Sequence, residues 1–243
     1  MCGRYGSIKS TAVLAERFVA VPNEEAEERP PSWNVAPTQP VRAVLERPDQ
    51  GRLLVVLRWG LVPYWAKDPS IGTRQINARA ETLARKPAYR TALTRRRVLI
   101  PADGFYEWRR VDNGTKRGAR RPFWFTRADG DVLALAGLRE NWRDAEGNLM
   151  RTCTIVTCAA NPDVADIHDR MPVVLEPEMW ERWLDPEEKE PDEVTGLLVP
   201  PPAGTLVRHA VSDRVNKPEV DGPELVAPLE NDDTEEDASG RLL

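Results

Sequence analysis

A cysteine at position 2 is the first residue whose placement suggests chemistry. Removal of the initiator methionine would make it the N-terminal residue, with an α-amine of pKa about 8 beside a thiol of pKa about 8.5. Two carbons separate these nucleophiles, so the amine can form an imine with an aldehyde and the thiolate can then close a thiazolidine ring. We therefore interpret Cys2 as a candidate nucleophile toward aldehydes.

Two further segments carry residues suited to proton transfer. Glu107 lies in GFYEWRR among Phe105, Tyr106 and Trp108, an apolar setting that would raise its pKa and fit it for acid–base chemistry. An alternating strand could instead direct Glu107 outward. His168 ends the short run NPDVADIH, where an imidazole can project into a cleft or have only a structural role.

The segment INARAET carries a third candidate pair, Asn77 and Arg79. If the segment is extended, both side chains lie on one face. The amide could orient a sugar hydroxyl, and the guanidinium could hold a phosphate. The alternative is a surface segment that leads into a helix beginning at Glu81 and Thr82.

Cysteine usage argues against a disulfide framework and against a metal site. Cys2, Cys153 and Cys158 form an odd, sparse set, so we expect reduced thiols. Cys153 and Cys158 lie within the strand-like run TCTIVTC, where neighbouring side chains alternate between faces. We interpret these two cysteines as packed residues, and we expect no metal or other cofactor.

Composition and charge indicate a globular chain with a basic body. Of the 243 residues 41% are hydrophobic, which is ample for a core. Residues 1–175 carry 28 Lys and Arg against 20 Asp and Glu, whereas residues 176–243 carry 6 against 19. The basic body fits a polyanionic partner and equally a surface that keeps the protein soluble. With no membrane-length apolar run and no secretory signal, we expect a cytoplasmic protein.

Strand-like segments dominate the centre of the chain. We predict strands within 53–66, 95–110, 152–160 and 171–176, a hairpin over 122–138 with its turn near Asp129 and Gly130, and helices over 10–20, 161–168 and 177–184. Residues 22–40 and 113–121 are predicted as loops, and 219–243 as an acidic, disordered tail. These elements predict a single α+β domain, mainly antiparallel sheet curled into a barrel-like core with peripheral short helices.

Seven ordered motifs resemble those of the SOS response-associated peptidase (SRAP) family. They are MCGRY, WNVAPTQ, WGLVPYWA, INARAET, IPADGFYEW, ANPDVADIHDRMP and VSDRVN. The resemblance runs from Cys2 to about Asn216 and implies an SRAP-like catalytic and DNA-binding domain over residues 2–218. It assigns no role to the basic loop 116–121 or to the acidic tail.

The resemblance implies a monomer that recognises abasic sites in single-stranded DNA and crosslinks to them covalently through Cys2, shielding the lesion from strand cleavage. It implies Cys2 as the crosslinking residue, Asn77 and Glu107 as the orienting and acid–base residues, and His168 as a second proton-transfer group. The implied DNA-binding residues are Arg4, Gln39, Pro40, Trp65, Arg79, Trp108 and Arg170. Such a protein would work in the cytoplasm, on the nucleoid when bound to DNA, with self-processing and lyase activities as accompanying expectations.

Three other functions remain open from the sequence. N-terminal-cysteine amidohydrolases also begin Met-Cys-Gly, with the α-amine as base and the thiolate attacking an amide. A thiol peptidase that cleaves proteins or only its own Met1 is a second alternative. A module that binds single-stranded DNA without covalent chemistry is the third, because a basic body with tryptophans suffices for that.

Overall fold

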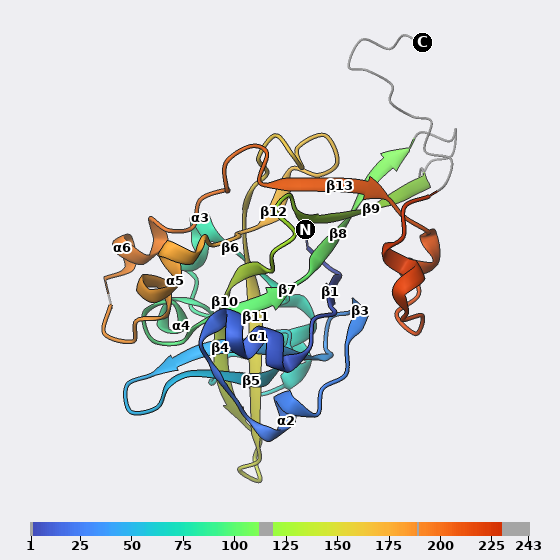
Figure 1. Ribbon diagram of the computed structural model, residues 1–243. Helices are drawn as coiled ribbons and strands as arrows, with labels where there is room; N and C mark the ends of the chain where they lie inside the picture. The colour runs from blue at the N-terminus through green and yellow to red at the C-terminus, as the bar shows by residue number, and fades with distance from the viewer. Residues whose placement is uncertain (1, 112–118, 189, 230–243) are drawn as a thin grey trace, which may run out of the picture.

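Two β-sheets make up most of the protein (Figure 1). The structure is a computed structural model that describes residues 2–111, 119–188 and 190–229. The larger sheet has eight strands: seven lie in the order β12-β11-β10-β7-β4-β5-β2, and the eighth, β6, pairs with β11. The smaller sheet has five strands in the order β13-β9-β8-β1-β3. Helices lie at the periphery, as Figure 1 shows for α1 in front of the barrel and α3 to α6 to one side.

The larger sheet closes into a five-stranded barrel. Its members are β4 (Pro40–Arg47), β5 (Gly51–Trp59), β7 (Arg97–Ala102), β10 (Leu133–Arg143) and β11 (Leu149–Ala159). Antiparallel pairs join β5 to β4, β4 to β7, β7 to β10 and β10 to β11, and a parallel pairing of β11 with β5 closes the ring. The predicted fold class, an α+β domain around a barrel-like sheet, is confirmed.

The smaller sheet continues from the barrel. It contains β1 (Tyr5–Ser7), β3 (Ser32–Val35), β8 (Gly104–Val111), β9 (Ala119–Arg127) and β13 (Leu206–Ala210). Asp103 alone separates β7 of the barrel from β8 of this sheet, so the predicted interruption in PADG marks the junction between the sheets. Phe105 and Phe125 stack across β8 and β9 with ring centroids 5.0 Å apart.

The remaining elements are short. They are β2 (Val21–Pro22), β6 (Asn77–Arg79), β12 (Arg170–Pro172), α1 (Thr11–Phe18), α2 (Glu24–Glu27), α3 (Ala80–Leu83), α4 (Arg90–Arg95), α5 (Pro177–Leu184), α6 (Pro191–Thr195), η1 (Pro69–Arg74), η2 (Asp213–Asn216) and η3 (Pro223–Val226). Two predicted helix starts are confirmed, because the Ser10 side chain accepts from the N–H of Val13 and Pro177 opens α5. Phe18 of α1 stacks on Trp180 of α5 at 4.5 Å.

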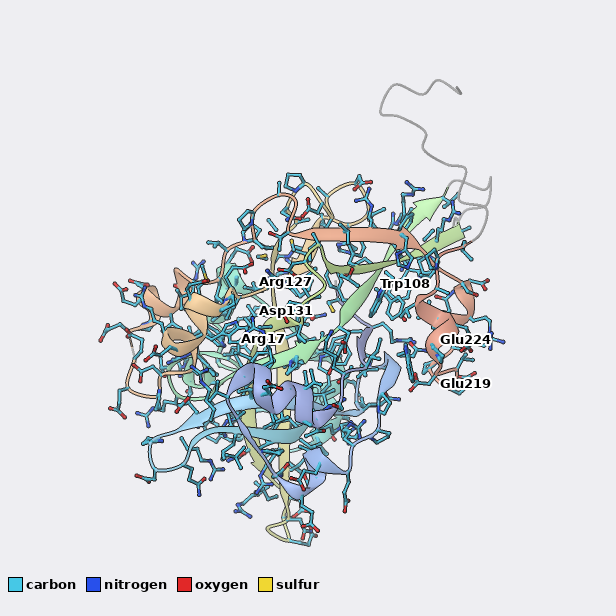
Figure 2. All side chains as sticks on the ribbon, viewed as in Figure 1. Arg17, Trp108, Arg127, Asp131, Glu219 and Glu224 are labelled. Atoms are coloured by element: carbon cyan, nitrogen blue, oxygen red, sulfur yellow. The ribbon has the colours of Figure 1, made fainter. Side chains whose placement is uncertain are left out.

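The predicted hairpin over 122–138 is wrong, although its turn is present. Gly130 adopts a φ of 75° in that turn, which glycine accommodates without strain. The flanking strands separate into different sheets, because β9 pairs with β8 and β13 while β10 pairs with β7 and β11. An ion pair of 2.7 Å between Arg17 and Asp131 ties this turn to α1 (Figure 2).

Three other expectations about elements are corrected. Residues 22–40 contain α2, capped by Asn23, and β3, which gains its partner only when β1 lies beside it. Residues 161–168 form successive turns instead of a helix, and the Asn161 side chain donates to the carbonyls of Pro201 and Pro202. The strand predicted over 171–176 is β12 at 170–172, followed by a single bridge between Leu135 and Val174.

The predicted start of the disordered tail at residue 219 is wrong. Leu225 of η3 is fully buried in a small core with Tyr106 and Trp124, and Asp221 accepts from the N–H of Trp33. The tail beyond residue 229 and residues 113–118 of the predicted basic loop lie outside the described residues. Residues 119–121 of that predicted loop belong instead to β9, where they pair with β8. Within the described ranges, no helix combines the length and apolarity needed to cross a membrane.

Candidate active site

Strand pairing brings the N-terminal residues beside Glu107. β1 runs antiparallel to β8, with Tyr5 opposite Phe105, and the N–H of Tyr106 donates to the carbonyl of Arg4 at 3.0 Å. In an antiparallel pair, residue numbers rise along one strand as they fall along the other. The residues before Tyr5 therefore lie beside the residues after Phe105. The fold therefore places Cys2 against the segment that carries Glu107.

Cys2 and Glu107 share a buried, electrostatically coupled environment. Cys2 is fully buried, and loss of solvent raises the pKa of its thiol well above the usual value, with the negative charge of Glu107 acting in the same direction. Glu107 is only 2% exposed, so it points inward. Burial raises the pKa of its carboxyl, and the charge of nearby His168 partly opposes that rise. A carboxyl with a raised pKa holds its proton to a higher pH than an exposed glutamate, which suits it for proton transfer.

Asn77 fixes the backbone of Cys2. Parallel pairing of β6 with β11 sets Asn77 opposite Ile155, and its Nδ2 donates to the Cys2 carbonyl at 2.8 Å. The Asn77 Oδ1 is buried, and no described residue donates a hydrogen bond to it. A buried acceptor without a hydrogen bond costs free energy, so this oxygen is suited to accept a hydrogen bond from a hydroxyl of a bound ligand.

His168 lies at the rim of a cleft. Its Nδ1 accepts from the N–H of Arg170 at 2.9 Å, which leaves the proton of the neutral ring on Nε2. Asp169 also approaches Nδ1, at 3.0 Å, but that contact requires a charged ring and Asp169 is 87% exposed, so the backbone bond is the stronger constraint. The cleft has a volume of about 360 Å³ and is lined by Trp108, Arg109, Arg110, Arg120 and residues 166–169.

Sequence comparison matches residues 1–218 to the family described as SOS response associated peptidase (SRAP). The chain belongs to the SRAP family. The abasic site processing protein YoqW of Bacillus subtilis is 42% identical over 226 residues, covering 93% of this chain and 99% of YoqW. The abasic site processing protein YedK of Escherichia coli is 33% identical over 244 residues, covering 94% of this chain and 100% of YedK. A solved structure from Bacteroides thetaiotaomicron shares the fold, with a TM-score of 0.82 at 22% identity over 94% of this chain and 100% of that one.

Two arginines that the SRAP resemblance predicts to bind DNA already form hydrogen bonds or ion pairs with other residues of the protein. Arg4 Nη1 donates to Asn34 Oδ1 at 2.8 Å and to the Val215 carbonyl at 2.7 Å. Arg170 forms a two-pronged ion pair with Glu81, at 2.6 and 3.0 Å, and also donates to the Thr157 carbonyl. Both side chains therefore brace the SRAP fold around the site, and any DNA contact would add to these bonds.

Three other predicted DNA-binding residues are at least partly exposed. Arg79 is exposed, and Trp65 is 50% exposed beside a cavity of about 450 Å³. Trp108 is half-buried and donates from Nε1 to Asn216 at 2.8 Å, next to the C-terminal segment that carries Glu219 and Glu224 (Figure 2). These tryptophans keep ring surface available for stacking.

Pro40 begins β4, and Gln39 directly before it follows a strained residue. Thr38 adopts a φ of 72°, which is rare for a β-branched side chain. Hydrogen bonds to both sides of Trp59 hold this backbone, since Thr38 donates to the Trp59 carbonyl and the Gln39 carbonyl accepts from Trp59. Gln39 Oε1 accepts from the N–H of Ala36 at 3.0 Å, and Pro40 is exposed.

Three arginines of the cleft were not singled out from the sequence. Antiparallel pairing of β8 with β9 sets Arg110 opposite Arg120 and Arg109 opposite Arg121. The sequence feature that could have revealed them is a pair of arginines at each end of the segment 109–121. If the segment folds as a hairpin, these two pairs come to lie opposite each other. The three arginines outnumber the two aspartates of the lining, Asp166 and Asp169, so the cleft beside His168 is basic on balance.

The remaining cysteines lie apart from this chemistry. Cys153 and Cys158 are buried and free, and burial raises the thiol pKa of Cys158 to about 11. No group of three or more His, Cys, Asp or Glu side chains in the described residues is arranged to hold a metal ion.

Proposed function

We propose that this SRAP protein recognises abasic sites in single-stranded DNA and captures them as a covalent thiazolidine crosslink through Cys2, once Met1 has been removed. The observation that carries the proposal is the buried cluster of Cys2, Glu107 and Asn77, with a basic cleft at its rim. Family relatives named abasic site processing proteins support the choice of lesion.

The first step is opening of the abasic sugar, which is mostly a closed hemiacetal. A proton must leave the C1′ hydroxyl and another must reach the ring oxygen before the aldehyde forms. Glu107 suits this exchange because burial raises the pKa of its carboxyl, so the group holds a proton to a higher pH than an exposed glutamate and can deliver it. Asn77 Oδ1 can accept a hydrogen bond from the sugar, and His168 can protonate the departing ring oxygen or act later on the adduct.

Capture then requires both nucleophiles of Cys2. The α-amine adds to the aldehyde carbon and the oxygen leaves as water, giving an imine. The sulfur adds to the imine carbon, while the thiol proton passes to the nitrogen by way of Glu107, and the five-membered ring closes. The positive charge of a protonated imine would lower the raised thiol pKa and so favour attack.

The product accounts for protection of the lesion. Strand cleavage by β-elimination needs C1′ as an aldehyde or an imine, and the thiazolidine removes both forms. Aromatic surface at Trp65 and Trp108 and the arginines of the cleft suit a bent single strand better than a duplex. We accordingly propose single-stranded DNA as the partner and a monomer as the working unit.

Self-processing at Met1 is the peptidase activity that we propose. Met1 is joined to the nitrogen of Cys2, so the Cys2 sulfur belongs to the same residue as the bond to be cleaved and needs no separate protein substrate. Release of ammonia from glutamine, or cleavage of an added protein, would favour the amidohydrolase or general peptidase alternatives.

The test uses a single-stranded oligonucleotide with one abasic site and the Cys2→Ala variant, with Cys158→Ala as an internal-cysteine control. Wild type and Cys158→Ala should give a band that survives boiling in detergent. Cys2→Ala should lose this band and instead cleave some of the strand through its imine, since the amine remains. A heat-stable crosslink in Cys2→Ala would refute ring closure through sulfur.

A further inference from the structure

Four arginines converge at one end of the barrel, away from Cys2. Arg47 ends β4, Arg96 directly precedes β7, and Arg139 and Arg151 lie on β10 and β11. Arg139 donates from its N–H to the Arg96 carbonyl at 2.8 Å, and the β4–β7 register extends to place Arg47 beside Arg96. Arg151 lies two residue pairs further along, opposite Asn141.

The charges of this arginine cluster are poorly compensated by the protein. Like charges on neighbouring strands repel one another and destabilise a sheet. Burial, and then the charges of Arg96 and Arg47, lower the pKa of Arg139 to about 10. An anion between the guanidinium groups would relieve the repulsion between their charges.

Glu140 lies beside this cluster, and both of its carboxylate oxygens already accept hydrogen bonds. Glu140 is 3% exposed; its Oε2 accepts from Arg96 Nη2 at 2.7 Å and its Oε1 from the N–H of Asn141 at 2.9 Å. Within the described ranges, the Nε atoms of Arg96 and Arg139 are buried and have no hydrogen-bond partner. Buried donors without partners carry a free-energy penalty, so both N–H groups point to an acceptor supplied by a ligand.

We propose that this arginine cluster is a binding site for a phosphoryl group. A phosphoryl group offers several acceptor oxygens and about two negative charges, and the planar fork of arginine matches that geometry. The site is separate from the Cys2 cluster, because Arg96 precedes β7 whereas Glu107 lies beyond the far end of that strand. It is independent of the proposed crosslinking reaction.

The experiment measures binding of inorganic phosphate to the full chain by calorimetry, with sodium chloride at matched ionic strength. Arg139→Gln should weaken phosphate binding at least tenfold, and Arg151→Gln, an exposed position with little risk to folding, should weaken it less. The control is Arg143→Gln on the same strand, whose guanidinium is exposed and already donates to the Gly147 carbonyl. Its phosphate affinity should equal that of wild type.

A second arm uses an undamaged oligonucleotide in place of inorganic phosphate. Loss of oligonucleotide affinity in Arg139→Gln, with no phosphate binding in wild type, would identify the DNA backbone as the source of the phosphoryl group. Loss of phosphate binding alone would identify a free anion. Equal binding of both probes by wild type, Arg139→Gln and Arg151→Gln, or no saturable binding of either probe, would overturn the proposal.

Discussion

Burial keeps the Glu107 carboxyl protonated to a higher pH than an exposed glutamate. A group whose pKa is raised in the folded state binds its proton more tightly there than in the unfolded chain. The contribution of Glu107 to the free energy of unfolding is therefore greatest below the pKa of the unfolded chain, about 4.3, and falls as the pH rises toward the pKa of the folded protein. The burial that suits Glu107 to its proposed role as a proton carrier thus also makes its ionisation unfavourable in the folded protein.

Replacing Glu107 with glutamine should separate stability from chemistry. We expect the stability of Glu107→Gln not to fall with rising pH in this way, so the variant should be more stable than wild type at pH 7. Crosslinking should slow by about 10² or more, because the amide cannot carry a proton. Urea unfolding from pH 4 to 8 and single-turnover crosslinking measure the two effects. Identical pH profiles of stability in the two proteins would contradict this explanation.

Residue-level prediction from the sequence succeeded where the chemistry is local. A cysteine at position 2 has its special reactivity whatever the fold, so Cys2 could be found without a structure. The inward orientation of Glu107 could not, because residues 104–107 are all buried and the strand shows no alternation. The partners of Arg4 and Arg170 were equally out of reach, since Val215 and Glu81 lie 211 and 89 residues away in sequence.

At the scale of elements, Asp103 connects the barrel to the sheet that carries Glu107. Its Oδ2 accepts from the backbone N–H groups of Ile8 and Lys9, and its Oδ1 pairs with Lys9 Nζ at 3.1 Å. These bonds fix the chain just after β1, the strand that sets Cys2 beside β8. Asp103 therefore positions the N-terminal segment from a distance.

We expect Asp103→Ala to lower the free energy of unfolding by about 2 kcal/mol, because two partly buried N–H groups lose their acceptor. Crosslinking yield should fall with it, since β1 is less firmly held. Asp49→Ala, at an exposed position in the turn between β4 and β5, is the matched control and should stay within about 0.5 kcal/mol of wild type. Equal denaturation midpoints for Asp103→Ala and wild type would show that this contact is not needed.

Helices and turns were predictable where a local residue, such as a cap, determines them. Strands were missed where pairing with a distant strand determines them. Ser10 and Pro177 identify the starts of their helices locally. The turn at Gly130 was visible too, but it does not specify that β9 and β10 belong to different sheets. Likewise, β3 exists because β1 offers an edge, which the proline-rich sequence around it does not indicate.

At the scale of the whole molecule, the C-terminal residues up to 229 brace the site from outside. Asn34 Nδ2 donates to the carbonyls of Lys217 and Val220, at 3.0 and 2.6 Å. Leu225 is buried, and Leu229 donates to the carbonyl of Ala210 at 3.2 Å. The family match ends at residue 218, so residues 219–229 lie beyond it. They pack η3 against β8 and β9 through Leu225, Tyr106 and Trp124.

Truncation should locate the functional end of the domain. A chain ending at residue 229 should unfold at the same temperature as wild type. A chain ending at 218 should lose roughly 2–3 kcal/mol from burial of Leu225 alone, a fall of about 4–12 °C for a protein of this size. Thermal unfolding followed by circular dichroism measures both. Equal melting temperatures for the two truncations would show that residues 219–229 contribute nothing.

The most direct measurement of the central claim is intact-mass spectrometry of the purified protein, alone and after mixing with a single-stranded abasic oligonucleotide. We predict a free protein that lacks Met1, and a product heavier by the oligonucleotide less one water, with the modification on the peptide that begins at Cys2. Retention of Met1 in a protein that still crosslinks, or an unmodified protein beside damaged DNA, would contradict capture by the amine and sulfur of Cys2.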